Sequence, residues 1–179
     1  MMHEVILVNE IDEAIGSMEK MEAHEKALLH RAFSVFLFDT NGNMLLQKRA
    51  ATKYHSPSLW TNACCSHPMP GETTEQAALR RLQEELGFTV AISKAFHFTY
   101  KAAFDNGLTE HEFDHVFVGE YEGDMQLNDE EVSEVCYKSM TDIKVELEHN
   151  AGDYTEWFKI AFPLLEEWMQ QNKSSHAAA

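Results

Sequence analysis

The sequence predicts a mixed α/β (α+β) fold, a sandwich in which sheets pack against flanking helices. Strand-length hydrophobic segments joined by turn residues recur along the chain, as in Ala32–Phe38 and Met44–Arg49. Two segments instead space their apolar residues as a helix does, one within 73–86 and one near the C-terminal end. No repeat or low-complexity block interrupts this pattern. We therefore expect a single domain over residues 1–171, followed by a disordered tail at 172–179.

Composition excludes several classes of function. A chain of 179 residues can bury a substantial core, but its formal net charge of −16 argues against binding nucleic acid. The longest apolar run, around 33–38, is too short to cross a bilayer, and no secretory signal pattern opens the chain. Three cysteines, two of them adjacent, make a poor disulfide framework. We expect a cytoplasmic protein without membrane insertion, as a monomer or weak dimer.

The first half of the chain is expected to be mostly strands. A hairpin is predicted where the Asp39–Gly42 turn separates two apolar segments. A short helix or loop carrying His24 should precede it. The expected elements are strands at Glu4–Asn9, Ile15–Glu19, Ala32–Phe38 and Met44–Arg49, the helix or loop at Met21–Leu29, and a loop at Ala50–Ser58.

The second half should add two helices to another antiparallel pair of strands. Thr141 is a candidate cap for a helix ending near His149. The last helix should begin near Asp153 and kink at Pro163. The expected strands are Ala95–Phe104 and Glu110–Tyr121, which flank a turn at 105–107, and Val135–Ser139.

A helix at 73–86 carries a patterned set of charges. Thr73 and Gln76 can form a capping box at its start. The residues fit the spacing E-x7-R-x-U-x-E-E-x-G-U, where U is aliphatic or aromatic: Glu72, Arg80, Leu82, Glu84, Glu85, Gly87 and Phe88. Such a helix can hold Mg2+ and phosphate oxygens. The alternative is a solvated helix with ion pairs at i,i+4, which a shorter motif would favour.

This pattern is similar to the Nudix box, with two departures. Ser66 replaces the first Gly, and Arg81 replaces the Glu that normally follows the Arg. The preceding stretch, Trp60–Pro68, reads W-T-N-x-x-C-x-H-P and resembles the cysteine motif of type I isopentenyl diphosphate isomerases. That resemblance extends over nearly the whole chain. It implies a Nudix-like sandwich that isomerises isopentenyl diphosphate to dimethylallyl diphosphate through a tertiary carbocation.

The same resemblance implies a buried metal site. Its ligands would be His24, His30, His67, Glu110 and Glu112, holding one Mn2+, Mg2+ or Zn2+. Strand alternation independently puts the two glutamates on one face, where a buried pair needs a cation or a shared proton. An exposed strand face is the alternative for an isolated E-x-E.

Proton transfer would fall to a thiol and a carboxyl group, Cys65 and Glu112, in an order that the sequence leaves open. Tyr100 matches a family tyrosine that assists this transfer, with simple packing as its alternative. Trp157 matches the tryptophan that faces the carbocation, and a place in the helix core is its alternative. Cys64 should be a small buried hydrophobe.

Diphosphate binding would use four basic residues. They are Lys20, Arg49, Lys53 and Arg81, and a Mg2+ held by Glu85 would bridge to the phosphates. Lys53 could instead be a solvated surface residue. Two other functions stay open: a Nudix-type pyrophosphohydrolase and a non-catalytic metal- or nucleotide-binding module. Arg81 and the pairing of Cys65 with Glu112 argue against the hydrolase, and the presence of both proton-transfer groups alongside the metal ligands argues against the module.

Overall fold

The computed structural model describes residues 4–104 and 106–177, and within them nine strands form one mixed sheet. Its central strand, β3 (His30–Phe38), runs parallel to β8 (Thr109–Glu120) and antiparallel to its other partners. The other strands are β1 (Glu4–Val8), β2 (Ala14–Glu19), β4 (Met44–Arg49), β5 (Trp60–Thr61), β6 (Cys64–Ser66), β7 (Ile92–Ala103) and β9 (Val132–Lys138). The helical elements are α1 (Lys20–Glu25), α2 (Thr74–Leu86), α3 (Met140–His149), the 3-10 turn η1 (Ala151–Asp153) and α4 (Glu156–Ala177).

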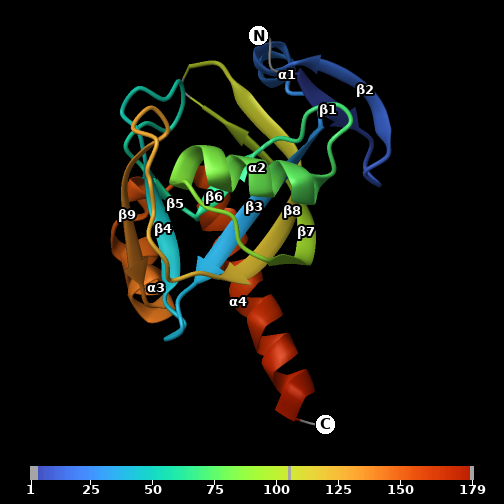
Figure 1. The fold of residues 1–179 in the computed structure, drawn as a ribbon. Coiled ribbons are helices and arrows are strands. Elements are labelled where there is room, and N and C mark those ends of the chain that lie inside the picture. Colours follow the sequence, from blue (N-terminus) through green and yellow to red (C-terminus); the bar gives the residue numbers. More distant parts are fainter. Residues whose placement is uncertain (1–3, 105, 178–179) are drawn as a thin grey trace.

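Both faces of β3 are buried, which explains its almost unbroken apolar sequence. Phe33, Val35 and Leu37 pack in one core cluster with α2. Phe36 and Phe38, which alternate with them, pack in a second cluster with α4. Figure 1 shows α2 lying across one face of the sheet while α4 passes behind the other. The predicted arrangement of a mixed sheet between flanking helices is confirmed.

Helix α2 has the start that the sequence predicts. The Gln76 backbone N–H donates to Thr73 Oγ1 over 3.1 Å, and the Thr73 N–H donates to the Gln76 side chain over 3.0 Å. The helix ends at Gly87, whose φ of 79° suits glycine. A side chain there would also collide with the chain, because a Cβ would lie 2.6 Å from the Cβ of Gln126. The capping box is thus confirmed, and the helix that carries the charged motif is fixed at both ends.

Two predicted helix starts are wrong. Ser139, not Thr141, caps α3, because Ser139 is extended at the end of β9 and its Oγ accepts from the Asp142 N–H over 3.1 Å. Helix α4 begins at Glu156 rather than near Asp153. The chain is still extended just before it, where the Thr155 N–H donates to the Trp60 carbonyl over 3.0 Å. This contact ties the start of α4 to the segment that carries the cysteine motif.

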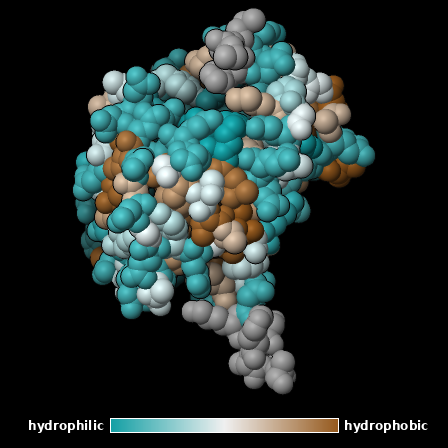
Figure 2. Space-filling model, viewed as in Figure 1, coloured by the Kyte–Doolittle hydropathy of each residue, from teal (hydrophilic) through white to brown (hydrophobic). Residues whose placement is uncertain are grey.

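The following features concern the end of the chain and its surface. Helix α4 continues through Pro163 to Ala177, past the boundary at residue 171 that we expected, and its C-terminal part extends beyond the sheet (Figure 1). Asp105 of the predicted turn, together with Ala178 and Ala179 of the expected tail, lies outside the described residues. None of the described helices combines the length and apolar content needed to cross a membrane. Figure 2 shows hydrophilic residues over most of the viewed face, as expected from the charge of −16.

Candidate active site

One cavity gathers nearly all of the predicted site residues. Every one of those side chains except His24 and His30 lines it. The cavity has a metal end, which we define by the histidines and by Glu110 and Glu112. It also has a phosphate end, defined by the basic residues and α2. The groups predicted for proton transfer line the same cavity: Cys65, Tyr100 and Glu112, together with Trp157.

At the metal end, four potential ligands converge from four different elements. The ligand atoms of His24, His30, His67 and Glu112 all lie within 4.8 Å of one another. His24 comes from α1 and His30 from the first position of β3. His67 follows β6, and Glu112 belongs to β8. His24 and His30, which the resemblance implies as ligands of one metal, therefore converge on one point.

Backbone hydrogen bonds orient the histidines toward this centre. His24 Nδ1 donates to the Lys20 carbonyl over 2.6 Å, and His30 Nδ1 donates to the Leu28 carbonyl over 2.8 Å. Their Nε2 atoms are thereby left as lone-pair donors. His30 Nε2 lies 3.2 Å from His67 Nε2, and His24 Nε2 has no hydrogen-bond partner within the described part of the chain. Buried lone pairs that face one another fit a metal ion, and this use of Nδ1 is common among metal-bound histidines.

The two predicted carboxylates share one hydroxyl. Tyr100 Oη lies 2.9 Å from Glu110 Oε2 and 2.7 Å from Glu112 Oε2. Glu112 Oε1 is 2.8 Å from His67 Nε2. Burial, followed by the charge of Glu112, raises the pKa of Glu110 well above its ordinary value. Burial also lowers the pKa of His67 to about 3, so its ring is neutral, as a metal ligand must be. Glu110, the fifth predicted ligand, lies beside the group of four but is not part of it.

Cys65 and Trp157 form other parts of the cavity wall. Burial raises the pKa of the Cys65 thiol, so this group holds its proton at neutral pH. Its neighbour Cys64 is fully buried in the core against α2, as predicted. Trp157 is 2% exposed, and the Arg49 guanidinium carbon lies 5.2 Å from the centre of its ring. The indole face already accommodates a cation in this geometry.

Lys20 and Arg49 belong to the phosphate end. Burial, with the charge of Lys53 next, lowers the pKa of Lys20 to about 8, which leaves it mostly charged at pH 7. Arg49 is held by the loop after β4, donating to the carbonyls of His55 and Ser56 over 3.2 Å each. Arg49 is buried and Lys20 is half-buried, and an anion that enters the cavity would compensate their charge.

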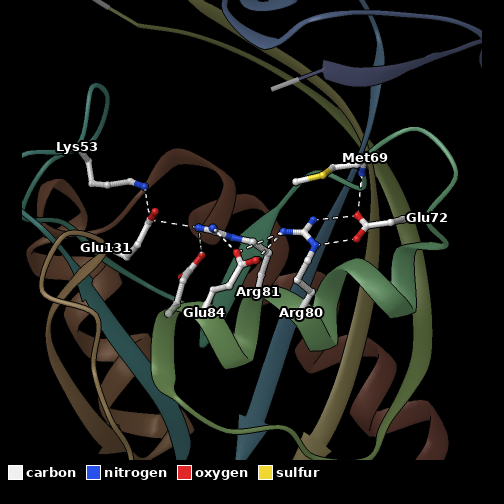
Figure 3. Close-up of polar contacts among 8 residues, drawn as sticks. Lys53, Met69, Glu72, Arg80, Arg81, Glu84 and Glu131 are labelled. Atoms are coloured by element: carbon white, nitrogen blue, oxygen red, sulfur yellow. Dashed lines mark hydrogen bonds and ion pairs between the residues drawn. The ribbon is translucent and has the colours of Figure 1, made fainter. Parts of the chain in front are cut away.

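Carboxylates already surround the other two cations of the phosphate end, as Figure 3 shows. Arg81 lies 2.8 Å from Glu84, 2.6 Å from Glu85 and 3.2 Å from Glu131. Lys53 contacts the same Glu131 oxygen, Oε2, so that one atom bridges both cations. No motif in the sequence selects Glu131, which precedes β9. The close contacts with Lys53 and Arg81 are visible only in three dimensions.

The neighbouring Arg80 has a structural partner. It forms a two-pronged pair with Glu72 over 2.7 and 2.9 Å and also reaches Glu84 over 3.3 Å (Figure 3). The predicted i,i+4 pairs, Arg80 with Glu84 and Arg81 with Glu85, are both confirmed. Arg80 therefore stabilises the box, whereas Arg81 faces the cavity.

Several buried polar residues are not among the predicted site residues. His55 and His115 are two of them, and their side chains are buried, with 8% and 5% of their surface exposed. His55 lines the cavity, and so does Asp114, which accepts from Ser34 Oγ over 2.7 Å. Asp114 could have been found by alternation, since it continues the face of Glu110 and Glu112 along β8. His55 has no such signal, because its partners are distant in sequence.

Comparisons with known proteins agree with this site. The family model described as the NUDIX domain matches residues 28–158. A relative from Serratia proteamaculans, named Isopentenyl-diphosphate Delta-isomerase, is 48% identical over 154 residues, which cover 86% of each chain. A relative of the same name from Pectobacterium atrosepticum is 45% identical over 174 residues, which cover 97% of each chain. Identity of this degree over most of both chains shows the family.

Solved structures support the fold. The structure of DR0079 from Deinococcus radiodurans aligns with a TM-score of 0.73 at 19% identity, covering 89% of this chain and 97% of that one. The MutT protein from Methanosarcina mazei aligns with a TM-score of 0.65, also at 19% identity. The predicted Nudix-like fold and the resemblance to type I isomerases are thus both confirmed. The chain belongs to the isopentenyl-diphosphate Delta-isomerase family, a family that carries the NUDIX domain.

Proposed function

We propose that this protein interconverts isopentenyl diphosphate and dimethylallyl diphosphate by adding one proton and removing another. One observation carries the proposal: a single cavity joins proton-transfer groups at one end to basic residues at the other. The basic end suits the diphosphate, and the hydrocarbon would then extend toward Cys65 and Glu112. Burial of the intervening space keeps water away from a reactive intermediate.

Cys65 and Glu112 divide the two proton transfers between them. The protonated Cys65 thiol can donate, and the Glu112 carboxylate can accept or donate once it is protonated. Tyr100 supports the second group, because its hydroxyl lies 2.7 Å from Glu112. Protonation of the alkene creates a tertiary carbocation, and the Trp157 indole face can stabilise such a cation by about 2 kcal/mol when it is desolvated.

His24, His30, His67 and Glu112, with Glu110 beside them, would hold a Mn2+, Mg2+ or Zn2+ ion. When bound, that ion supplies positive charge that fixes Glu112 and tunes its proton affinity. At the other end, Lys20, Arg49, Lys53 and Arg81 would contact phosphate oxygens, and Glu85 would hold a Mg2+ on the diphosphate. The three free cysteines suit a reducing cytoplasm, which is our proposed location. A monomer or weak dimer stays a prediction.

Pyrophosphate hydrolysis is the second candidate, because the chain carries a NUDIX domain. Arg81 argues against it, since a cation stands at the place where the hydrolase box has a carboxylate, and its contacts occupy Glu84 and Glu85. Incubation with isopentenyl diphosphate and Mg2+, followed by analysis of both products, separates the two functions. We expect allylic diphosphate without free phosphate. Phosphate release without an allylic product would overturn the proposal.

A further inference from the structure

His55 is a buried histidine in the loop between β4 and β5. Two non-glycine residues of this loop, Ser56 and Ser58, have positive φ values of 48° and 61°. Such conformations are rare and persist only where the surrounding structure fixes them. The His55 carbonyl accepts from Arg49, and the His55 side chain points into the cavity lining. The loop therefore places this ring between the phosphate end and the metal end.

Aromatic neighbours fix the plane of the His55 ring. It stacks on Phe104 with ring centres 5.2 Å apart and planes 15° apart. It meets Trp157 edge to face at 5.7 Å and 89°. Tyr54 contacts it at 4.3 Å, also nearly perpendicular. A ring held on three sides has little freedom to rotate, so the direction of its Nε2 atom is defined.

That Nε2 atom lies 3.4 Å from Glu110 Oε1. Glu110 and Glu112 therefore contact similar partners, each with a hydroxyl at Oε2 and a histidine near Oε1. Tyr100 lies between their Oε2 atoms, His67 contacts Oε1 of Glu112, and His55 approaches Oε1 of Glu110. His67 belongs to the four-residue metal group, whereas His55 does not. His55 therefore approaches the oxygen of Glu110 that Tyr100 leaves free.

We propose that His55 is a positioning residue that holds Glu110 in place beside Glu112. The contact that would hold Glu110 is the 3.4 Å approach of His55 Nε2 to Glu110 Oε1, and the His55 ring packs against Trp157. Removing the N–H should leave Glu110 free to turn away from the metal centre. This role rests on the metal site of the proposed function. Partners that orient metal ligands commonly change metal affinity or activity by about 10–100-fold when they are lost.

Two substitutions separate the roles of the ring and the N–H. His55→Phe keeps an aromatic ring of similar size but removes the donor, whereas His55→Gln keeps a donor and removes the ring. His149→Phe is the control, because His149 is exposed and its Nδ1 bonds to the carbonyl of Val145 in its own helix. Each variant would be stripped of metal and titrated with Mn2+ alone, and then assayed for kcat and KM with isopentenyl diphosphate.

For His55→Phe we expect the Kd for Mn2+ to rise and kcat to fall, each by about tenfold, with KM largely unchanged. His55→Gln should recover most of the Mn2+ affinity, and His149→Phe should match the unmodified protein. In a Glu110→Ala background, His55→Phe should have no further effect on Mn2+ binding, because both changes break the same contact. Unchanged Mn2+ affinity in His55→Phe, or losses that add in the double variant, would overturn the proposal.

Mn2+ binding is measured without substrate, so this test is separate from the test of the isomerase function. A protein that binds Mn2+ but makes no allylic product would contradict the isomerase function and leave this inference standing.

Discussion

The metal end and the phosphate end of the cavity hold their charged groups in different ways. At the metal end, backbone carbonyls orient His24 and His30, and the ligand atoms of the four-residue group converge within 4.8 Å. At the phosphate end, Lys53 and Arg81 already contact carboxylates, and a single oxygen of Glu131 bridges them. Backbone carbonyls thus orient these two histidines, whereas ion pairs between side chains hold Lys53 and Arg81.

Because of this difference, the free-energy cost of binding a metal ion should differ from that of binding a diphosphate. A metal ion can enter among oriented lone pairs with little rearrangement, and it relieves the burial of unpaired groups. A diphosphate must instead compete with Glu131 for Lys53 and Arg81. That competition lowers affinity, but it also keeps two long, flexible side chains in place before the substrate arrives. Substitutions at the metal end should therefore affect catalysis, and those at the phosphate end should affect binding.

The largest effect should come from Cys65→Ala, because it removes a proton-transfer group without touching the basic residues. We expect turnover to fall by roughly 10³-fold or more, while diphosphate affinity stays nearly unchanged. Turnover and equilibrium binding would be measured on the same preparation. Cys64→Ala is the matched control, since Cys64 is buried against α2 and should lower stability but keep turnover. Normal turnover in Cys65→Ala with loss in Cys64→Ala would show that the wrong cysteine was assigned.

The next largest effect should follow His67→Ala or His24→Ala. Each removes one of four converging ligands, so transition-metal affinity and turnover should both fall, by about tenfold at least. Metal analysis of the purified variants gives the stoichiometry, and His97→Ala, an exposed histidine on β7, provides the control. Full metal content in both variants would contradict the predicted site.

At the phosphate end, Arg81→Glu should weaken substrate binding by about 2–3 kcal/mol, since a charge-assisted contact is lost. It should not create efficient hydrolysis, because the rest of the cavity is unchanged. Kd and phosphate release would be measured together. Arg80→Gln is the control, because Arg80 pairs with Glu72 instead of lining the cavity. Equal losses in the two variants would mean that Arg81 acts through the stability of α2.

The smallest effect, and the sharpest test of the comparison, is expected from Glu131→Gln. Removing this carboxylate should free Lys53 and Arg81 to contact the substrate. The binding free energy should become more favourable by about 0.5–1 kcal/mol, which lowers the substrate Kd roughly two- to fivefold. The gain should shrink as salt increases, since exposed charges are screened. Binding isotherms at low and high salt would show this. Weaker binding in Glu131→Gln would mean that the carboxylate orders the cations more than it competes with the diphosphate.

Features that depend on local spacing could be predicted from the sequence, and features that depend on distant contacts could not. The capping box of α2 and the shared face of Glu110 and Glu112 were predictable, because local spacing determines them. His55 and Glu131 were not predictable, because their partners Glu110, Lys53 and Arg81 come close to them only in the folded chain. The starts of α3 and α4 were misplaced for a related reason. Helix α3 begins two residues earlier than expected, because β9 ends at Lys138 and leaves Ser139 extended as the cap. Helix α4 begins later than expected, because a bond to the distant Trp60 carbonyl keeps the backbone extended at Thr155.

The most direct test of the isomerase function is to run the reaction in D2O with Mg2+ and to locate deuterium in the product by NMR. Proton addition by groups that exchange with solvent, such as Cys65 and Glu112, should place deuterium in the methyl group formed from the terminal alkene carbon. The diphosphate should remain intact. An allylic product without solvent deuterium would contradict the protonation–deprotonation mechanism, and free phosphate without any allylic product would contradict the isomerase function itself.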